Sequence, residues 1–257
     1  MNRVKRHLVV VLCALVTLPF AARAQPNAWQ TKHQMASWYA VTVDHAMTNK
    51  MSLWFDGQWR RMGVGSKPQQ LLLRPGLQFE LAAGVHVAAG YAYIASAPYG
   101  EAPTLTPLRE HRMWHQLLLS HRAGPLSVRH RYRWEQRWIS ASTVDGAAGA
   151  SPSGPFYQQR ARYLTSVQGR LSRPRVGVSP LLVFVSDEIL LPVGHSDAHA
   201  RFAQNRAAIG LGVPVNERVR LELSYLNLWN ALPSARINEV SHTISLSVRW
   251  TSAKRLN

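Results

Sequence analysis

Hydrophobic and polar residues alternate along most of this chain with a period of two, the period of a β-strand. The clearest case is residues 129–138, and one face of the predicted strand carries Arg129, Arg131, Arg133, Glu135 and Arg137. The opposite face carries His130, Tyr132, Trp134, Gln136 and Trp138. One face of this strand is therefore a charged ladder, and the other is largely aromatic.

Ten further segments alternate in the same way, and a helical period fits them poorly. All the predicted strands lie near residues 35–45, 50–60, 69–82, 84–95, 109–122, 126–139, 157–171, 175–187, 201–214, 217–229 and 238–250. Many exceed the usual strand length of about 5–6 residues in soluble proteins. They are long enough for the tilted spans of about 9–11 residues found in outer-membrane barrels.

The connections between these strands alternate between tight and long. Tight turns are predicted at Ala83-Gly84, Ala123-Gly124-Pro125, Ser172-Arg173-Pro174 and Val215-Asn216, and long connections at 96–108, 140–156 and 188–200. Short turns on one side and long loops on the other are typical of outer-membrane barrels. The prediction is an all-β fold: an antiparallel up-and-down transmembrane β-barrel of 10 to 12 strands, with short periplasmic turns and longer extracellular loops.

The number of strands raises a question about the first one. Eleven segments are visible, whereas single-chain bacterial barrels usually have an even number. Segment 35–45 therefore needs a partner, for which residues 26–34 are one candidate. The alternative is that it forms an irregular piece that enters the lumen.

The first residues have the layout of a secretory signal peptide. Arg3, Lys5 and Arg6 precede an almost wholly apolar run from residue 8, and the small-x-small pattern ends at Ala24. We expect cleavage after Ala24, a single barrel domain over residues 25–257, and a location in the cell outer membrane. Cys13 is the only cysteine. The mature chain would then have no disulfide, thiolate nucleophile or cysteine metal ligand.

The chain is strongly basic, and the bases are nearly all arginine. It has 257 residues with 30 Lys plus Arg, 13 Asp plus Glu and a formal net charge of +17. Four bases and no acids precede the predicted cleavage site, which leaves +13 on the mature chain. Because an exported protein rarely meets nucleic acid, we do not expect that partner. Arginine suits paired interior ions or anionic lipid head groups.

Charges inside a barrel must be paired or hydrated, because an isolated buried ion is very unfavourable. The candidate lumen network consists of Glu110, Arg112, Arg131, Arg133, Glu135, Arg137, Arg160, Arg162, Glu188, Gln204 and Arg206. It is either a structural plug that fixes the strand register or the lining of a pore that prefers anions. The expected partners are outer-membrane lipid, the barrel-assembly machinery and, for a pore, anionic small solutes.

Evidence for an enzyme is weak, and no catalytic, metal or cofactor residue is assigned. Ser120 and His121 are neighbours, but no nucleophile-elbow motif supports a hydrolase site. His195, Asp197 and His199 alternate in a long loop, where a metal could bind, although solvated loop residues are the favoured interpretation. An outer-membrane enzyme acting on lipid or peptide, and a soluble exported polyanion-binding β protein, remain the alternatives.

A resemblance to a known family rests on short motifs in a fixed order. They are Trp38, Lys50-Met51-Ser52-Leu53, Arg60, Arg74-Pro75-Gly76-Leu77 with Phe79, Glu110, Arg112 with Gln116, Arg131-x-Arg133-x-Glu135-x-Arg137, Arg160-x-Arg162, Asp187-Glu188, and Asn205-Arg206 with Gly210. In these the chain resembles a family of uncharacterised outer-membrane proteins catalogued as domain of unknown function 2490. The resemblance implies an outer-membrane β-barrel and no established activity.

Overall fold

The computed structural model describes residues 29–100, 106–141, 155–171, 180–194, 204–232 and 236–252. The regular secondary structure in these ranges consists of β-strands alone. No helix among the described residues is long and apolar enough to cross a membrane. The predicted signal peptide, the turn at 172–174 and the loop at 195–199 lie outside the described residues.

The described residues form eleven strands, one for each predicted segment. They are β1 Gln30–Ala46, β2 Met51–Met62, β3 Lys67–Ala82, β4 Val85–Ser96, β5 Leu108–Ala123, β6 Leu126–Ala141, β7 Phe156–Arg170, β8 Leu182–Val193, β9 Gln204–Pro214, β10 Val219–Leu232 and β11 Ile237–Thr251. Their number falls within the predicted range of 10 to 12. Ten of them overlap closely with the predicted segments.

The bounds predicted for β8 are wrong. The prediction ended the strand at residue 187 and placed residues 188–200 in a loop, whereas the strand continues to Val193. The strand continues through Asp187-Glu188 because Glu188 points into the interior, where arginines pair with it.

The sheet closes into a barrel through its first and last strands. β1 pairs with β11 in parallel, from Gln30 opposite Ile237 to Asp44 opposite Thr251, and all the other neighbouring strands pair antiparallel. An odd number of up-and-down strands requires this, because the first and last strands then run in the same direction. The proposed partner for segment 35–45, residues 26–34, was therefore wrong; its partner is β11.

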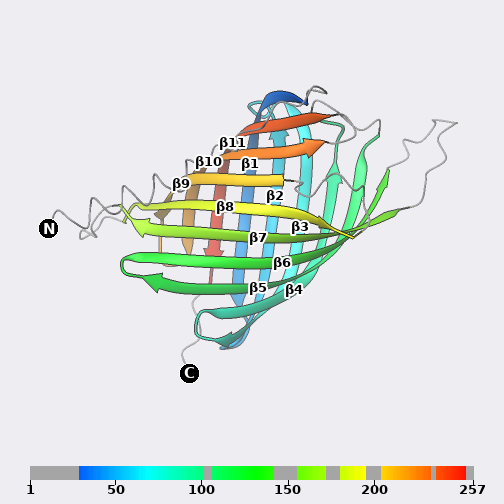
Figure 1. The fold of residues 1–257 in the computed structure, drawn as a ribbon. Helices are drawn as coiled ribbons and strands as arrows, with labels where there is room; N and C mark the ends of the chain where they lie inside the picture. Colours follow the sequence, from blue (N-terminus) through cyan, green and yellow to red (C-terminus); the bar gives the residue numbers. More distant parts are fainter. Residues whose placement is uncertain are drawn as a thin grey trace.

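The two ends of the barrel differ in their connections (Figure 1). The β1–β2, β3–β4, β5–β6 and β9–β10 turns lie at one end, and the strand ends that lead into the longer β4–β5, β6–β7 and β8–β9 connections lie at the other. Gly84 in the β3–β4 turn has a φ of 77°, and a Cβ there would lie 2.2 Å from the Ser120 carbonyl oxygen. Glycine is required at this turn, because any other residue would be strained at this positive φ and its Cβ would collide with the Ser120 carbonyl.

The strands of the barrel's two walls cross in projection. In Figure 1, β5 to β8 run across the near wall at a steep angle to β1, β2 and β3 on the far wall. Successive side chains point alternately inward and outward. On β3, Leu72 and Arg74 are 4% and 5% exposed, whereas Leu73 between them is 39% exposed. The interior is therefore filled by one face of each strand, as the alternation predicted.

Candidate functional site

A carboxylate on β6 lies at the centre of the interior. Glu135 is completely buried, at 0% exposed. Its Oε1 accepts hydrogen bonds from Arg112 Nη1 at 3.1 Å and Arg162 Nη1 at 2.7 Å, and its Oε2 accepts one from Arg160 Nε at 2.9 Å. Three guanidinium groups from two neighbouring strands, β5 and β7, therefore surround one carboxylate.

Two further carboxylates extend this network along the barrel wall. Glu110 on β5 pairs with Arg112 and accepts two hydrogen bonds from Arg137, Nε to Oε1 at 2.7 Å and Nη2 to Oε2 at 2.9 Å. Glu188 on β8 accepts two hydrogen bonds from Arg162, Nε to Oε1 at 2.9 Å and Nη2 to Oε2 at 2.8 Å. Arg131 and Arg206 also pair with Glu188, at 2.7 and 3.6 Å.

The resulting ion network comprises Glu110, Arg112, Arg131, Glu135, Arg137, Arg160, Arg162, Glu188 and Arg206. It links every strand from β5 to β9. Removing one partner of such a buried pair is strongly destabilising, because it leaves a charge uncompensated. The arrangement therefore fixes which residues of five adjacent strands face each other.

The neighbouring part of the interior is apolar. Leu72, Ala88, Ala92, Ile94 and Trp114 form a buried cluster, and Trp54 packs edge-on against Trp114 at 5.2 Å between ring centroids. The Trp114 ring lies directly over two glycines, since a Cβ on Gly76 or Gly90 would lie within 2.6 Å of it. The ring therefore covers the inner face of the neighbouring β4 and of β3 beyond it, where a side chain in place of either glycine would collide with it.

Arg133 joins the apolar cluster to the charged residues. Its guanidinium lies 4.7 Å from the Trp114 ring centroid, and it donates two hydrogen bonds to Gln116 Oε1, from Nε at 3.0 Å and Nη2 at 2.6 Å. A cation over an aromatic face is attracted by the ring quadrupole. The interior is therefore continuous from the ion network to the tryptophans.

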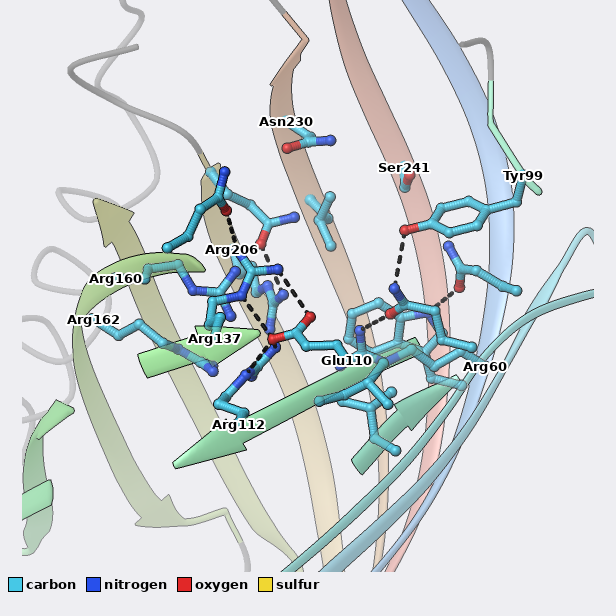
Figure 2. A pocket seen from close by; sticks show the side chains of 18 of the residues that line it. Arg60, Tyr99, Glu110, Arg112, Arg137, Arg160, Arg162, Arg206, Asn230 and Ser241 are labelled. Atoms are coloured by element: carbon cyan, nitrogen blue, oxygen red, sulfur yellow. Dashed lines mark hydrogen bonds and ion pairs between the residues drawn. The ribbon is translucent and has the colours of Figure 1, made fainter. Parts of the chain in front are cut away.

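Above Glu135, toward the long connections, the interior opens into a cavity of about 400 Å³. We call this cavity the cup. Figure 2 shows Arg112, Arg137, Arg160, Arg162 and Arg206 grouped around Glu110, with Arg60 and Tyr99 facing them. Burial raises the pKa of the Tyr99 phenol, so its hydroxyl stays protonated. Tyr99 thus contributes a neutral hydroxyl to a cavity rich in guanidinium groups.

The structure brings all eleven of the sequence-derived lumen residues into the interior, because they occupy inward positions of β5 to β9. The sequence interpretation missed Asp56, Arg60, Arg74, Tyr99 and Glu239. For Arg74 a signal was present, since it alternates with Leu73 and Pro75 in its strand, whereas Arg60 is followed by another arginine, Arg61. Tyr99 lies in a long connection, where alternation carries no information.

The outer wall is apolar over its middle. Large exposed hydrophobic side chains include Leu53, Leu71, Leu77, Phe79, Ile209, Leu211, Leu221, Leu223, Ile244 and Leu246. Ring pairs lie toward both rims: Trp138–Tyr157 and Tyr93–His111 near the long connections, and His121–His130 and His45–Trp250 near the short turns. Asp187 interrupts this wall and accepts a hydrogen bond from Asn205 Nδ2 at 2.9 Å.

The described residues provide no support for the candidate enzyme sites. Ser120 and His121 are consecutive on β5, so they point to opposite faces, and His121 stacks on His130 outside the barrel. Asp187 and Glu188 also point to opposite faces. Within the described ranges no group of three or more His, Cys, Asp or Glu side chains could hold a metal ion.

Comparison with known families places the chain in a family whose function is unknown. The family model described as "Protein of unknown function (DUF2490)" matches residues 35–238, most of the chain. A search of the curated proteins finds no match. The chain belongs to the DUF2490 family, as the order of its motifs indicated.

Proposed function

We propose that this DUF2490 member is a transmembrane barrel of the bacterial outer membrane whose interior is closed by the ion network. The apolar outer wall supports the membrane part of the proposal. Monomeric soluble proteins rarely expose contiguous apolar surface of this extent. Aromatic rings near both rims of an apolar band are also the pattern of outer-membrane barrels, where they lie at the two interfaces.

Glu135 carries the proposal of a closed interior. Its carboxylate is completely shielded from solvent, and its charge is balanced by arginine side chains. A water-filled channel at this level would hydrate the carboxylate. We therefore favour a structural plug over an anion-conducting pore, and the protein acts as a non-conducting barrel with a recess at one end.

Fractionation tests the location. The protein is expected in the outer-membrane fraction, resistant to extraction by urea and released by detergent. Recovery in the soluble periplasm without detergent would overturn the membrane proposal and favour a soluble exported protein.

Planar-bilayer recording tests the plug. Wild-type protein, shown to be folded by heat-modifiable gel mobility and inserted by protection from protease, is expected to remain electrically silent. Stepwise current that favours anions would overturn the closed interior and establish the pore interpretation.

Single cysteines test the orientation. If the signal peptide is removed the chain has no cysteine, so each introduced thiol would be unique. Val64→Cys at the long-connection end, where Val64 is 94% exposed, should react with a membrane-impermeant maleimide on intact cells. Asn216→Cys in the β9–β10 turn should react only after permeabilisation. The reverse pattern would invert the proposed orientation.

A further inference from the structure

The cup contains more positive charge than the described residues neutralise. Its lining includes seven arginines but only two carboxylates, those of Glu110 and Glu239. Including the groups just below it, the described interior of this half has nine arginines: Arg60, Arg74, Arg112, Arg131, Arg133, Arg137, Arg160, Arg162 and Arg206. It has five carboxylates: Asp56, Glu110, Glu135, Glu188 and Glu239. The surplus is four positive charges in a confined space.

Arg60 is the clearest example of this surplus. The residue is only 6% exposed, and its guanidinium donates to the amide oxygens of Gln58 and Gln70 at 2.6–3.1 Å. It also lies 3.7 Å from the Trp38 ring centroid. No carboxylate of the described chain forms an ion pair with it. Neutral amides and an aromatic ring therefore hold this cation in place without cancelling its charge.

Arg206 faces the same tryptophan from β9. Its guanidinium lies 5.7 Å from the Trp38 ring centroid, and Nη2 donates to Gln204 Oε1 at 2.8 Å. Its carboxylate contact, with Glu188, is long at 3.6 Å, and its buried Nε has no hydrogen-bond partner among the described residues. Two incompletely neutralised guanidinium groups thus lie near the same tryptophan ring, and each disfavours the other's charge.

We infer that the cup is a binding site for a small phosphomonoester, with its phosphate group held between Arg60 and Arg206. A phosphate monoester carries about −1.5 to −2 charge at pH 7 on one centre and has three acceptor oxygens. Guanidinium forks pair with phosphate oxygens in a bidentate manner. The protonated Tyr99 hydroxyl offers a further donor. The cup's volume is within the range of about 300–1,000 Å³ typical of small-ligand pockets.

The ion network around Glu135 closes the cup at its lower end, so a ligand can enter and leave only at the other end. The inference therefore concerns binding and not conduction. The side of the membrane from which the ligand enters rests on the proposed orientation. Binding itself does not, because it is measured on the barrel in detergent. Failure of binding is therefore distinguishable from failure of the membrane proposal.

The test is calorimetric titration of the folded, detergent-solubilised barrel with glycerol 3-phosphate at low salt. Saturable one-to-one binding that weakens as NaCl rises is expected, with no binding of glycerol. Malonate, a dicarboxylate, is expected to bind more weakly. No saturable binding at millimolar glycerol 3-phosphate would overturn the site, and equal binding of malonate would overturn the phosphate assignment.

Variants then locate the site. Arg60→Gln and Arg206→Gln should each lower affinity about 10–100-fold, the effect of losing a charge-assisted hydrogen-bond donor. Arg220→Gln is the matched control, since Arg220 pairs with Glu222 near the short turns, outside the cup. It should leave affinity unchanged. Equal losses in Arg60→Gln and Arg220→Gln would overturn the assignment.

A stability readout separates binding from support. A surplus cation is unfavourable in the empty protein, so Arg60→Gln should unfold at the same or a higher denaturant concentration than wild type. If the role of Arg60 were purely structural, Arg60→Gln would instead lower the stability of the barrel and leave the affinity of the folded fraction unchanged. If Arg60→Gln does not fold, Tyr99→Phe takes its place, because Tyr99 lies outside the strands; an unchanged affinity in that variant would count against the site.

Discussion

The ion network and the apolar cluster fill adjacent parts of the same interior by different means. Around Glu135, packing depends on directional hydrogen bonds between oppositely charged groups. Around Trp114 it depends on shape, with a large ring lying over two glycines. Burial of apolar surface is non-directional, whereas a buried ion requires its partners in place. The comparison predicts different tolerances to substitution in the two parts.

The difference also explains how register is fixed. A slip of one residue turns every side chain of a strand to the other face. On β6 that slip would move Glu135 to the outer wall and bring Trp134 inside. The network would then lose its central carboxylate, while the arginines of β5 and β7 would remain buried. The charged part of the interior therefore penalises a wrong register more strongly than the apolar part does.

Glu135→Ala tests the network at its most buried point, and we expect the largest loss of stability there. The substitution leaves Arg112, Arg160 and Arg162 without their shared carboxylate. It should lower the free energy of unfolding by about 3–5 kcal/mol. Denaturant unfolding in detergent, followed by tryptophan fluorescence, measures the loss. Even Glu135→Asp should destabilise, because the shorter side chain cannot reach all three guanidinium groups. Wild-type stability in both variants would contradict a directional network.

Leu72→Ala gives the matching measurement in the apolar cluster. Leu72 is 4% exposed, and truncation should lower the free energy of unfolding by about 2–4 kcal/mol through lost burial and a residual cavity. Here a conservative change should be tolerated: Leu72→Met should change stability by less than about 1.5 kcal/mol. If Leu72→Met were as harmful as Glu135→Asp, the two parts of the interior would not differ as proposed.

The same contrast shows what the sequence could and could not predict. Period-two alternation grouped Glu135 and its arginines on one face of each strand, and the predicted barrel, inferred from the lengths of the connections, made that face the interior one. It could not predict that β1 closes on β11, because alternation identifies strands but not their partners. Nor could it predict that Arg160 pairs with Glu135 or that Arg131 pairs with Glu188, because these ion pairs depend on the register between strands. The bounds of β8 show a further error, since the prediction ended the strand at residue 187 and the strand continues to Val193.

Leu223→Arg moves the test to the outer wall. Leu223 is 54% exposed near the middle of β10 and faces away from the interior. If that wall contacts lipid, arginine there should destabilise the inserted barrel by about 2–3 kcal/mol, as expected between the midplane and the interface. Leu223→Phe is the control and should insert normally. Folding into lipid vesicles, scored by heat-modifiable mobility, measures both; normal insertion of Leu223→Arg would mean that this wall does not contact hydrocarbon.

Glu222→Gln should have the smallest effect, and it separates burial from charge pairing. Glu222 pairs with Arg220 at 2.8 Å and Arg249 at 3.5 Å, but those arginine side chains are 20% and 33% exposed. Water and salt screen such a pair, so the expected loss is about 1 kcal/mol or less. It should shrink as NaCl is added, whereas the loss in Glu135→Ala should not. A salt-independent loss as large as that of Glu135→Ala would show that the ion pairs near the short turns are as inaccessible to water as those beneath the cup. Burial would then not distinguish the two groups of ion pairs.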